Sequence, residues 1–406
     1  MFDVVIVGGG PAGACAGALL ASGSCGLKGL SVAVLEPKPP CLPGASARLS
    51  PDARVVALSR ASERVLRRAG AWQHLPPGRV SAYERMHIWH ESVASTSDAV
   101  LTFDAADVAE PNLGYIVENR LLQGALLQAF SEAGGHLEAA PLRSLEFTAE
   151  GVSVGTAGGT LSARLVIGAD GASSALRAAA GLTAASFRYG QSAIVASVAT
   201  AASHQASAWQ RFMSRGTLAF LPLGSGESSI VWSADEALAG QLLAMSDGAF
   251  AQALDAASDL ALGRTRLTSE RVSFPLSRLS APRYVAERVA LIGDAAHVVH
   301  PLAGQGVNLG LLDAAALAQL VLDAGSAHED PGALRVLRAY ERWRKSEVAA
   351  MAASIDAFDR LLAHGRGPLA LFAQRGLSWV NHTPALRRFF IRRALGVSGE
   401  LPRSAR

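Results

Sequence analysis

The sequence predicts an α/β protein with a parallel sheet region, an inserted antiparallel sheet region and a helical C-terminal part. Residues 2–36 have the pattern of a buried strand, a glycine-rich turn, a small-residue helix and a second strand. Residues 185–278 alternate apolar and polar side chains, which is typical of antiparallel strands. A chain of 406 residues is long enough for about two such domains.

The two predicted domains alternate along the chain. Residues 119–133 predict a helix that ends at Gly134, and 142–167 predict a hairpin and a strand that returns to the first sheet. Residues 289–292 form another buried strand, after which the spacing is helical to about residue 395. We therefore assign 1–78, 111–182 and 281–330 to the first domain, 79–110 and 183–280 to a β-rich second domain, and 331–406 to a C-terminal helical region.

Composition argues against several classes of protein. Half of the residues are hydrophobic, yet no run of eighteen uncharged apolar residues occurs, so a membrane-spanning helix is not expected. The N-terminus has no basic signal region, and the three cysteines lack metal-ligand spacing. The net charge of +3 is small and dispersed, which does not indicate a nucleic-acid partner. These features predict a cytoplasmic protein without a metal site.

The first motif, at residues 8–13, combines three glycines in the spacing GxGxxG. Gly8 permits a tight turn after the strand, Gly10 allows the backbone to approach a pyrophosphate, and Gly13 allows close helix–strand packing. Glu36 ends the second strand, where a carboxylate can bind ribose hydroxyls. The alternative is a glycine-rich turn with a surface glutamate.

The second motif follows the apolar strand at 165–167 with Gly-Ala-Asp-Gly at residues 168–171. Small polar residues and Arg177 come next and predict the start of a helix. Asp170 is the candidate binding residue in this motif. The alternative is an ordinary strand-to-helix turn in which Asp170 caps the helix.

The third motif spans residues 291–308 and also begins where a strand ends. Asp294 is placed to accept hydrogen bonds from sugar or ribityl hydroxyls. Gly304 and Gly306 lead into a helix that runs through Asp313, and the N-terminus of this helix would stabilise negative charge on a reduced flavin ring. The alternative is a helix cap with a glycine-rich lead-in.

Together, and in this order, the three motifs resemble those of the class A flavoprotein monooxygenases of the para-hydroxybenzoate hydroxylase type. The resemblance covers nearly the whole chain and implies a Rossmann-like FAD-binding domain with an inserted substrate domain. It also implies that a nicotinamide cofactor, NADH or NADPH, binds transiently as the reductant. The residues that it assigns to FAD binding are Gly8, Gly10, Pro11, Ala12, Gly13, Glu36, Arg54, Arg120, Asp170, Asp294, Pro301, Gly304, Gln305, Gly306, Val307 and Asn308.

Further segments narrow the resemblance to ubiquinone-biosynthesis hydroxylases of the UbiH/UbiF/UbiI type. These are Arg-Val-Val-Ala-Leu-Ser at 54–59, Asn-Arg-Leu at 119–121, the strand at 216–223 and Gly-Glu-Leu-Pro at 399–402. The implied activity is hydroxylation of a polyprenylated phenol with O2, through a flavin C4a-hydroperoxide. Arg54 and Arg120 would then contact the FAD diphosphate, which suits a fixed guanidinium, or else form structural ion pairs.

The sequence offers two candidates for a catalytic role. His300 lies beside the expected flavin site and could shuttle a proton, whereas His297 is expected to cap or pack. Arg211 could meet a substrate oxygen from the sheet domain. Residues 220–222 (Phe-Leu-Pro) are expected either to wall the substrate ring or to belong to the sheet core.

The segment from Leu386 to Leu395 is rich in arginine and aromatic residues, and Leu386, Phe389 and Phe390 share one face of the predicted helix. Such a helix could rest on the inner face of the plasma membrane, dock a partner in a ubiquinone-biosynthesis complex, or pack in the core. Three other functions remain open: a hydroxylase of a small soluble aromatic, a flavin halogenase and a non-enzymatic flavin scaffold. A halogenase is disfavoured because the sequence has no Trp-x-Trp-x-Ile stretch and no lysine in a flavin motif.

Overall fold

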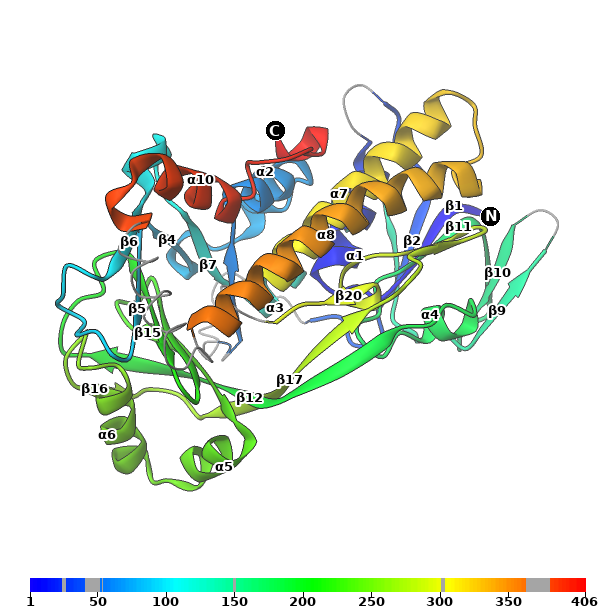
Figure 1. Cartoon of the computed structure of the whole chain (residues 1–406). Coiled ribbons are helices and arrows are strands. Elements are labelled where there is room, and N and C mark those ends of the chain that lie inside the picture. Colours follow the sequence, from blue (N-terminus) through cyan, green and yellow to red (C-terminus); the bar gives the residue numbers. More distant parts are fainter. Residues whose placement is uncertain (24–26, 41–51, 53, 149–150, 301–303, 363–379) are drawn as a thin grey trace.

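The molecule consists of two sheet regions joined by the long strands β12 and β17, with α7 and α8 lying across the parallel region (Figure 1). This computed structural model describes residues 1–23, 27–40, 52, 54–148, 151–300, 304–362 and 380–406, and side chains up to 356 within α8. The order of the first sheet is β18 (Val285–Ala286), β19 (Val289–Leu291), β11 (Thr160–Gly168), β1 (Phe2–Val7), β2 (Val32–Leu35) and β8 (His136–Glu138).

The centre of the first sheet is parallel, as the apolar run at residues 4–7 predicts. β19, β11, β1, β2 and β8 all run in one direction, and the side chains of residues 4–7 are buried. Antiparallel strands occur at its margins, where β18 pairs with β19 and the hairpin β9–β10 pairs with β11. The remaining elements here are β9 (Ser144–Phe147), β10 (Val152–Gly155), α1 (Pro11–Ser22), α3 (Asn119–Glu132), α4 (Ala175–Ala179), α7 (Gln305–Ser326) and α8 (Leu334–Leu362).

The second sheet is antiparallel except where β13 runs parallel to β5. Its alternating side chains divide between two faces. One face buries Ile194, Leu218 and Trp232 against α5 and α6, and the other face borders a cavity. Its strands are β20 (His297–Val298), β17 (Val272–Ser280), β12 (Ala185–Thr200), β15 (Ser228–Asp235), β14 (Gly216–Pro222), β13 (Ser207–Met213), β5 (Arg85–His90) and β6 (Leu101–Asp104), with β16 (Thr265–Leu267) beside β12.

A small third sheet has the strand order β3, β7, β4. The segment 79–110, predicted as one piece of the second domain, is thus divided, because β4 joins this small sheet while β5 and β6 join the large antiparallel one. The elements are β3 (Val55–Leu58), β4 (Val80–Tyr83), β7 (Gly114–Glu118), α2 (Arg60–Arg68), α10 (Pro384–Ala394) and the 3-10 helices η1 (Trp72–His74), η2 (Pro77–Arg79), η3 (Ala105–Val108), η4 (Gly293–Ala295) and η6 (Arg403–Ala405).

Two helices interrupt the segment that the alternation predicts as continuous sheet. They are α5 (Glu236–Ala244) and α6 (Asp247–Ala257). The Asp235 carboxylate accepts a hydrogen bond from the Leu238 N–H at 2.8 Å, and the Ser246 hydroxyl accepts one from the Ala249 N–H at 3.3 Å. These N-caps satisfy helix donors that no strand pattern would reveal.

Within the described residues, α7 is the one helix long and apolar enough to cross a membrane by composition. However, 78% of its most apolar 18-residue window is buried inside the protein. It packs against α1, α2 and α8. We therefore interpret α7 as a core helix, whose apolar character serves packing.

One charged side chain, Asp313, lies fully buried in the middle of α7. Its carboxylate accepts hydrogen bonds from His297 Nε2 at 2.5 Å, Arg344 Nε at 2.8 Å and the Gly293 N–H at 3.1 Å. Burial alone would raise the pKa of Asp313, but His297 and Arg344 reverse the effect and lower it. The network fixes the turn after β19 onto α7, and it gives His297 the structural role expected from the sequence.

We predict that Arg344→Met destabilises the protein by about 3–5 kcal/mol, because it leaves the Asp313 carboxylate buried beside a histidine that is charged only when protonated. Denaturant unfolding of the FAD-free protein measures this change. Arg342→Met is the matched control, since Arg342 is exposed on the same helix. Equal stability of the two variants would contradict the importance of the buried pair.

Candidate active site

The three glycine-containing motifs meet at one point of the fold. Gly8 has a positive φ of 103°, and a Cβ there would lie 2.4 Å from the Ala169 carbonyl oxygen. A Cβ at Gly13 would lie 1.9 Å from the Gly8 carbonyl oxygen. The Ala12 Cβ is the nearest atom to the Cβ position of Gly293, at 3.2 Å. The backbones of the first and second turns are therefore in direct contact, which requires Gly8 and Gly13, and the Ala12 side chain brings the third turn next to the first.

Arg177, which follows the second motif, ties that motif to the third. Its Nη1 donates to the Ala295 carbonyl at 2.8 Å, and its Nη2 donates to the Ala172 carbonyl at 2.7 Å. The Asp170 carboxylate accepts from the Ser174 hydroxyl at 2.5 Å and from the Leu176 N–H at 3.0 Å. Asp170 thus stabilises the start of α4, as the capping interpretation predicts.

Gly10 differs from Gly8 and Gly13 because no contact with the described part of the chain requires it to be a glycine. It is the N-cap of α1 with φ of −63°, and no atom lies within 4 Å of a Cβ built there. Gly306, in the first turn of α7, has the same open surroundings. Both helix N-termini therefore face free space where unpaired N–H groups can bind an anion or a polar ring.

Glu36 closes the turn of the first motif. One carboxylate oxygen accepts from the Gly9 N–H at 2.9 Å, and the other accepts from the Lys38 N–H at 3.0 Å. Gln123 on α3 donates from Nε2 to the Gly9 carbonyl at 3.0 Å. The sequence analysis missed Gln123, because only the fold brings α3 beside α1. The half-buried Glu36 carboxylate keeps lone pairs that suit sugar hydroxyls.

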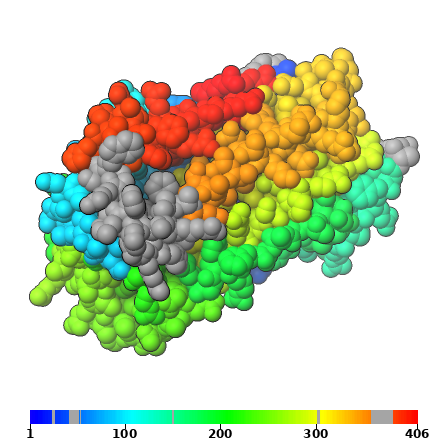
Figure 2. Space-filling view, viewed as in Figure 1, coloured from blue at the N-terminus to red at the C-terminus, as the bar shows by residue number. Residues whose placement is uncertain are grey.

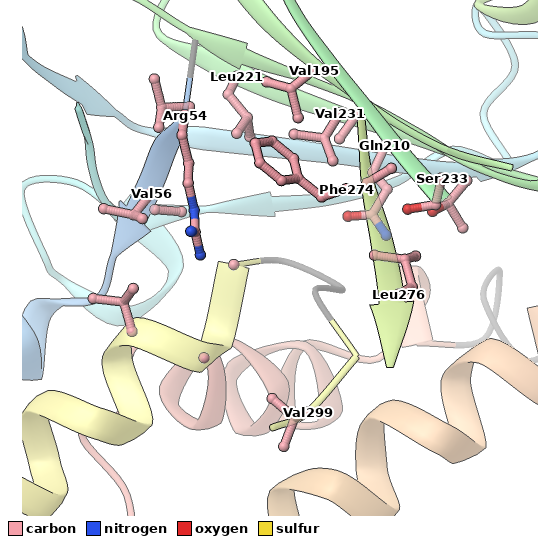
Figure 3. A pocket seen from close by; sticks show the side chains of 18 of the residues that line it. Arg54, Val56, Val195, Gln210, Leu221, Val231, Ser233, Phe274, Leu276 and Val299 are labelled. Atoms are coloured by element: carbon pink, nitrogen blue, oxygen red, sulfur yellow. The ribbon is translucent and has the colours of Figure 1, made fainter. Parts of the chain in front are cut away.

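A cavity of about 320 Å³ lies between the third motif and the antiparallel sheet (Figure 3). The motif side contributes Asp294, Gly304, Gly306 and Val307, and β3 with its preceding residue contributes Arg54, Val55, Val56 and Ala57. The sheet side contributes mostly apolar residues together with four neutral polar ones; its members are Met86, Ala193, Val195, Ala208, Trp209, Gln210, Thr217, Ala219, Leu221, Val231, Ser233, Phe274, Pro275, Leu276 and Ser277. The two sheet regions thus enclose the site between them.

Two charged groups, Arg54 and Asp294, line the cavity among the described residues. The Arg54 guanidinium extends into the cavity, 5.8 Å from the centre of the Phe274 ring (Figure 3). The Asp294 carboxylate borders the cavity, and the surrounding protein removes much of its solvation, which raises its pKa. The nearby His297 and Arg54 partly offset this rise. Hydrogen bonds from ligand hydroxyls would stabilise the ionised carboxylate.

Asn308 supports the site from behind, whereas the sequence predicts contact with the flavin ring. Its Oδ1 accepts from the Ser59 N–H at 2.9 Å and from the Ser62 hydroxyl at 2.7 Å. Its Nδ2 donates to the Ala57 carbonyl at 2.8 Å and to the Gly304 carbonyl at 3.3 Å. This side chain is buried and fully bonded, so its role is to hold the start of α7 against β3 and α2.

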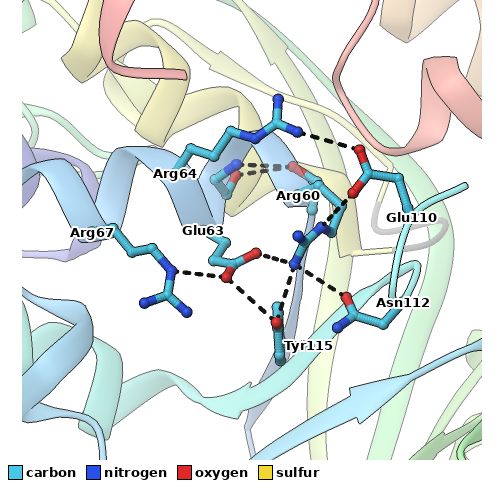
Figure 4. A network of polar contacts seen from close by, with 9 residues as sticks. Arg60, Glu63, Arg64, Arg67, Glu110, Asn112 and Tyr115 are labelled. Carbon is cyan, nitrogen blue, oxygen red and sulfur yellow. Dashed lines mark hydrogen bonds and ion pairs between the residues drawn. The ribbon is translucent and has the colours of Figure 1, made fainter. Parts of the chain in front are cut away.

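A charged network secures α2, and with it the partners of Asn308 (Figure 4). Arg60 pairs with Glu63 and with Glu110 and also donates to the Tyr115 hydroxyl at 3.1 Å. Arg67 pairs with the other Glu63 oxygen at 2.9 Å. Because Glu110 and Tyr115 precede and begin β7, the network anchors α2 to the small sheet.

The structure places Arg211 away from the cavity, contrary to the role considered from the sequence. Its Nη1 donates to the carbonyls of Ala256 and Ala257, at 3.2 and 2.8 Å, and its Nη2 donates to the Glu91 carbonyl at 3.2 Å. Side chains alternate along β13, so the neighbouring Gln210 faces the cavity instead. Arg211 therefore caps the C-terminal end of α6, which is a structural role.

His300 is buried beside β12 rather than in the cavity wall. Its Nε2 lies 3.4 Å from Gln191 Oε1, and its ring packs edge-on against Tyr189 with ring centres 4.8 Å apart.

Of residues 220–222, Leu221 lines the cavity, whereas Phe220 lies in the core on the opposite face of the sheet. The position of Leu221 is consistent with a wall of the substrate site, and the position of Phe220 is consistent with the sheet core.

The other predicted FAD contacts lie at the starts of three helices. Arg120 begins α3, is 79% exposed and lies 3.8 Å from the Asp52 carboxylate. Gln305 opens α7 beside the cavity residues Gly304 and Val307. Pro11 and Ala12 open α1. Pro301 lies outside the described residues.

Comparison with known proteins decides the family. The family described as FAD binding domain matches residues 1–354. The chain belongs to this FAD-binding family. Ubiquinone hydroxylase UbiL of Rhodospirillum rubrum is 36% identical over 397 residues, which cover 97% of this chain and 89% of that protein. The 3-demethoxyubiquinol 3-hydroxylase of Escherichia coli is 34% identical over 413 residues, covering 97% and 98% respectively.

The solved structures agree on the fold of this FAD-binding protein. The p-nitrophenol 4-monooxygenase PnpA from Pseudomonas putida matches with a TM-score of 0.75 at 18% identity, covering 97% of this chain and 98% of that one. The protein is a member of the FAD-dependent monooxygenases. FAD fits the site because Gly10 and Gly306 leave open space at two helix N-termini, and Glu36 and Asp294 supply carboxylates near them.

We predict that two glycine substitutions separate FAD binding from folding. Gly10→Val should lower the unfolding free energy of the FAD-free protein by no more than about 1 kcal/mol, the cost of losing an N-cap glycine, because its Cβ meets no atom of the described residues, yet it should abolish FAD retention. Gly13→Val should cost about 3 kcal/mol, because its Cβ overlaps the Gly8 carbonyl. Denaturant unfolding and flavin absorbance give the two readouts. A yellow Gly10→Val protein with normal flavin content would refute the assigned FAD site.

Proposed function

We propose that this protein is an FAD- and NAD(P)H-dependent monooxygenase that hydroxylates the aromatic ring of a polyprenylated phenol in ubiquinone biosynthesis. The observation that carries the proposal is the cavity between the FAD motifs and the antiparallel sheet. Its sheet side is largely apolar: alanine, valine and leucine side chains lie there together with Met86, Trp209 and Phe274. Such a surface suits an aromatic ring with an apolar substituent.

The similar proteins support the same substrate class. The relatives in R. rubrum and E. coli are named for hydroxylation of ubiquinone or of a ubiquinol precursor, and each similarity spans almost the full chain. We take NADH or NADPH as a transient reductant, since the sequence contains no second GxGxxG unit.

The residues of the chain divide the work of such a reaction. Bound FAD supplies the redox chemistry, namely hydride acceptance and activation of dioxygen. Arg54 and Asp294 are placed to hold its polar parts, and the N-terminus of α7 stabilises negative charge on the ring. Leu221 and Phe274 exclude water from the substrate side. His300, buried beside Gln191, remains a candidate for proton transfer.

The first test is quinone analysis by mass spectrometry in a strain lacking this gene. We expect ubiquinone to fall and a prenylated phenol lacking one oxygen to accumulate, with restoration by the original gene and no restoration by the Gly10→Val variant. The purified FAD-loaded protein should couple NAD(P)H oxidation to hydroxylation of a prenylated phenol.

Two other outcomes would reject this reading. Unchanged quinones together with turnover of a small aromatic by the purified protein would establish the alternative, a hydroxylase of a soluble aromatic. A lack of NAD(P)H oxidation by FAD-loaded protein with every phenol tested would indicate a flavin-binding scaffold.

We also propose that α10 places the protein at the inner face of the plasma membrane, where a prenylated substrate resides. Figure 2 shows α10 at the molecular surface. Phe390 and Ile391 pack inward beside Leu101 and Phe103, whereas Phe389 is 61% exposed, so the common face predicted for Phe389 and Phe390 is divided. The exposed face carries Arg388, Phe389 and Arg392, a combination that suits anionic lipid headgroups; a partner enzyme would be the other occupant.

We predict that the protein sediments with vesicles containing anionic lipid and that Phe389→Asp weakens this binding about tenfold, since it removes an apolar insertion and adds a negative charge. Phe147→Asp is the matched control, because Phe147 is a comparably exposed phenylalanine on β9. Binding that responds equally to both substitutions would contradict a role for α10.

A further inference from the structure

The antiparallel sheet contributes four neutral polar residues to the cavity lining, of which Ser277 on β17 is only half-buried. The three deeply buried ones are Gln210 on β13, Thr217 on β14 and Ser233 on β15, and their exposed fractions are 4%, 8% and 4%. Thr217 and Ser233 lie directly opposite each other in the ladder. Gln210 pairs with Ala219, two residues from Thr217 on the same face, which makes the three a contiguous patch. Figure 3 shows the Gln210 and Ser233 side chains at this wall.

None of the three side chains forms a hydrogen bond with any other described residue. Their polar atoms are not sealed inside the protein, so they open into the cavity, where a ligand can supply the hydrogen-bond partners that the described residues do not. Elsewhere on the same face the strands carry Ala193, Ala208 and Ala219, which need no partners. Small neighbours and polar groups that are open to the cavity together mark a place that suits a ligand with oxygen substituents.

None of the described residues that the antiparallel sheet contributes to the lining is charged. The charged residues among the described lining are Asp294 of the third motif and Arg54, which precedes β3. The nearest arginine on the sheet strand, Arg211, points to the other face and is occupied by three backbone carbonyls. A ring carboxylate placed against Gln210 would therefore be buried without a cation, whereas a hydroxyl or ether oxygen would find both donors and acceptors.

We propose that Gln210, with Thr217 and Ser233, binds the oxygen substituent of a neutral phenol ring and selects against the same ring bearing a carboxylate. The three are substrate-positioning residues: they fix which ring edge faces the flavin side of the cavity. This inference rests on the proposed function for the reaction, but the binding preference that it predicts is measurable without turnover.

The first experiment titrates FAD-loaded protein with a short-chain prenylated phenol and with the same compound carrying one ring carboxyl group. Perturbation of the flavin absorbance reports binding. We expect the neutral phenol to bind at least tenfold more tightly at pH 7, where the acid is ionised. Equal affinity, or tighter binding of the acid, would overturn the inference.

The second experiment compares Gln210→Met with Gln241→Met, which makes the same change on the exposed side of α5. We expect Gln210→Met to weaken phenol binding about three- to tenfold, the effect of losing one neutral hydrogen bond, and to lower the hydroxylated product formed per NAD(P)H consumed. Gln241→Met should leave both unchanged. Ser233→Ala, a smaller change in the same patch, should show the same direction.

The two proposals fail in different ways. If the original protein binds the neutral phenol preferentially but hydroxylates no phenol, the proposed function is wrong and the patch assignment stands. If it hydroxylates phenols while Gln210→Met and Ser233→Ala keep the original affinity and coupling, the proposed function stands and the patch assignment is wrong.

Discussion

The contact on which the rest of the structure depends is the direct backbone approach between the turn after β1 and the turn after β11. Gly8 faces the Ala169 carbonyl and Gly13 faces the Gly8 carbonyl, at distances that exclude any side chain. This approach aligns the carboxyl ends of two parallel strands and directs the N-terminus of α1 toward open space. Arg177 then attaches the third turn through the Ala295 carbonyl.

The position of α7 is set by two interior polar groups rather than by its apolar surface alone. Asp313 binds the turn at Gly293, and Asn308 binds β3 and the start of α2. An apolar helix surface packs without strong directional preference, whereas these hydrogen bonds fix the rotation of α7 about its axis and its position along that axis. The consequence is functional, because Gly304, Gly306 and Val307 at the end of α7 form one wall of the cavity.

The antiparallel sheet contributes the opposite wall through simple alternation. Side chains such as Ile194, Leu218 and Trp232 enter the core under α5 and α6, and their immediate neighbours face the cavity. One sheet therefore stabilises the second domain and shapes the substrate space at the same time. A shift of register by one residue would exchange the two sets, so the cavity lining is fixed by strand pairing.

The sequence by itself determined the parallel core, the three motifs and the class of cofactor, because these depend on local patterns: apolar strands, glycine spacing and a carboxylate at a strand end. It also indicated the family and the helices α1, α3 and α10 near their observed bounds, but not α5 and α6. Tertiary structure alone decided which side chains meet. Asn308 and Asp170 lie in binding motifs, but their side chains form hydrogen bonds with other residues of the protein. Arg211 lies on the face of the sheet away from the cavity, whereas Gln210 faces the cavity. Gln123 reaches the first turn from a distant helix. Such roles depend on packing direction and strand register between segments far apart in the chain, which residue spacing does not encode.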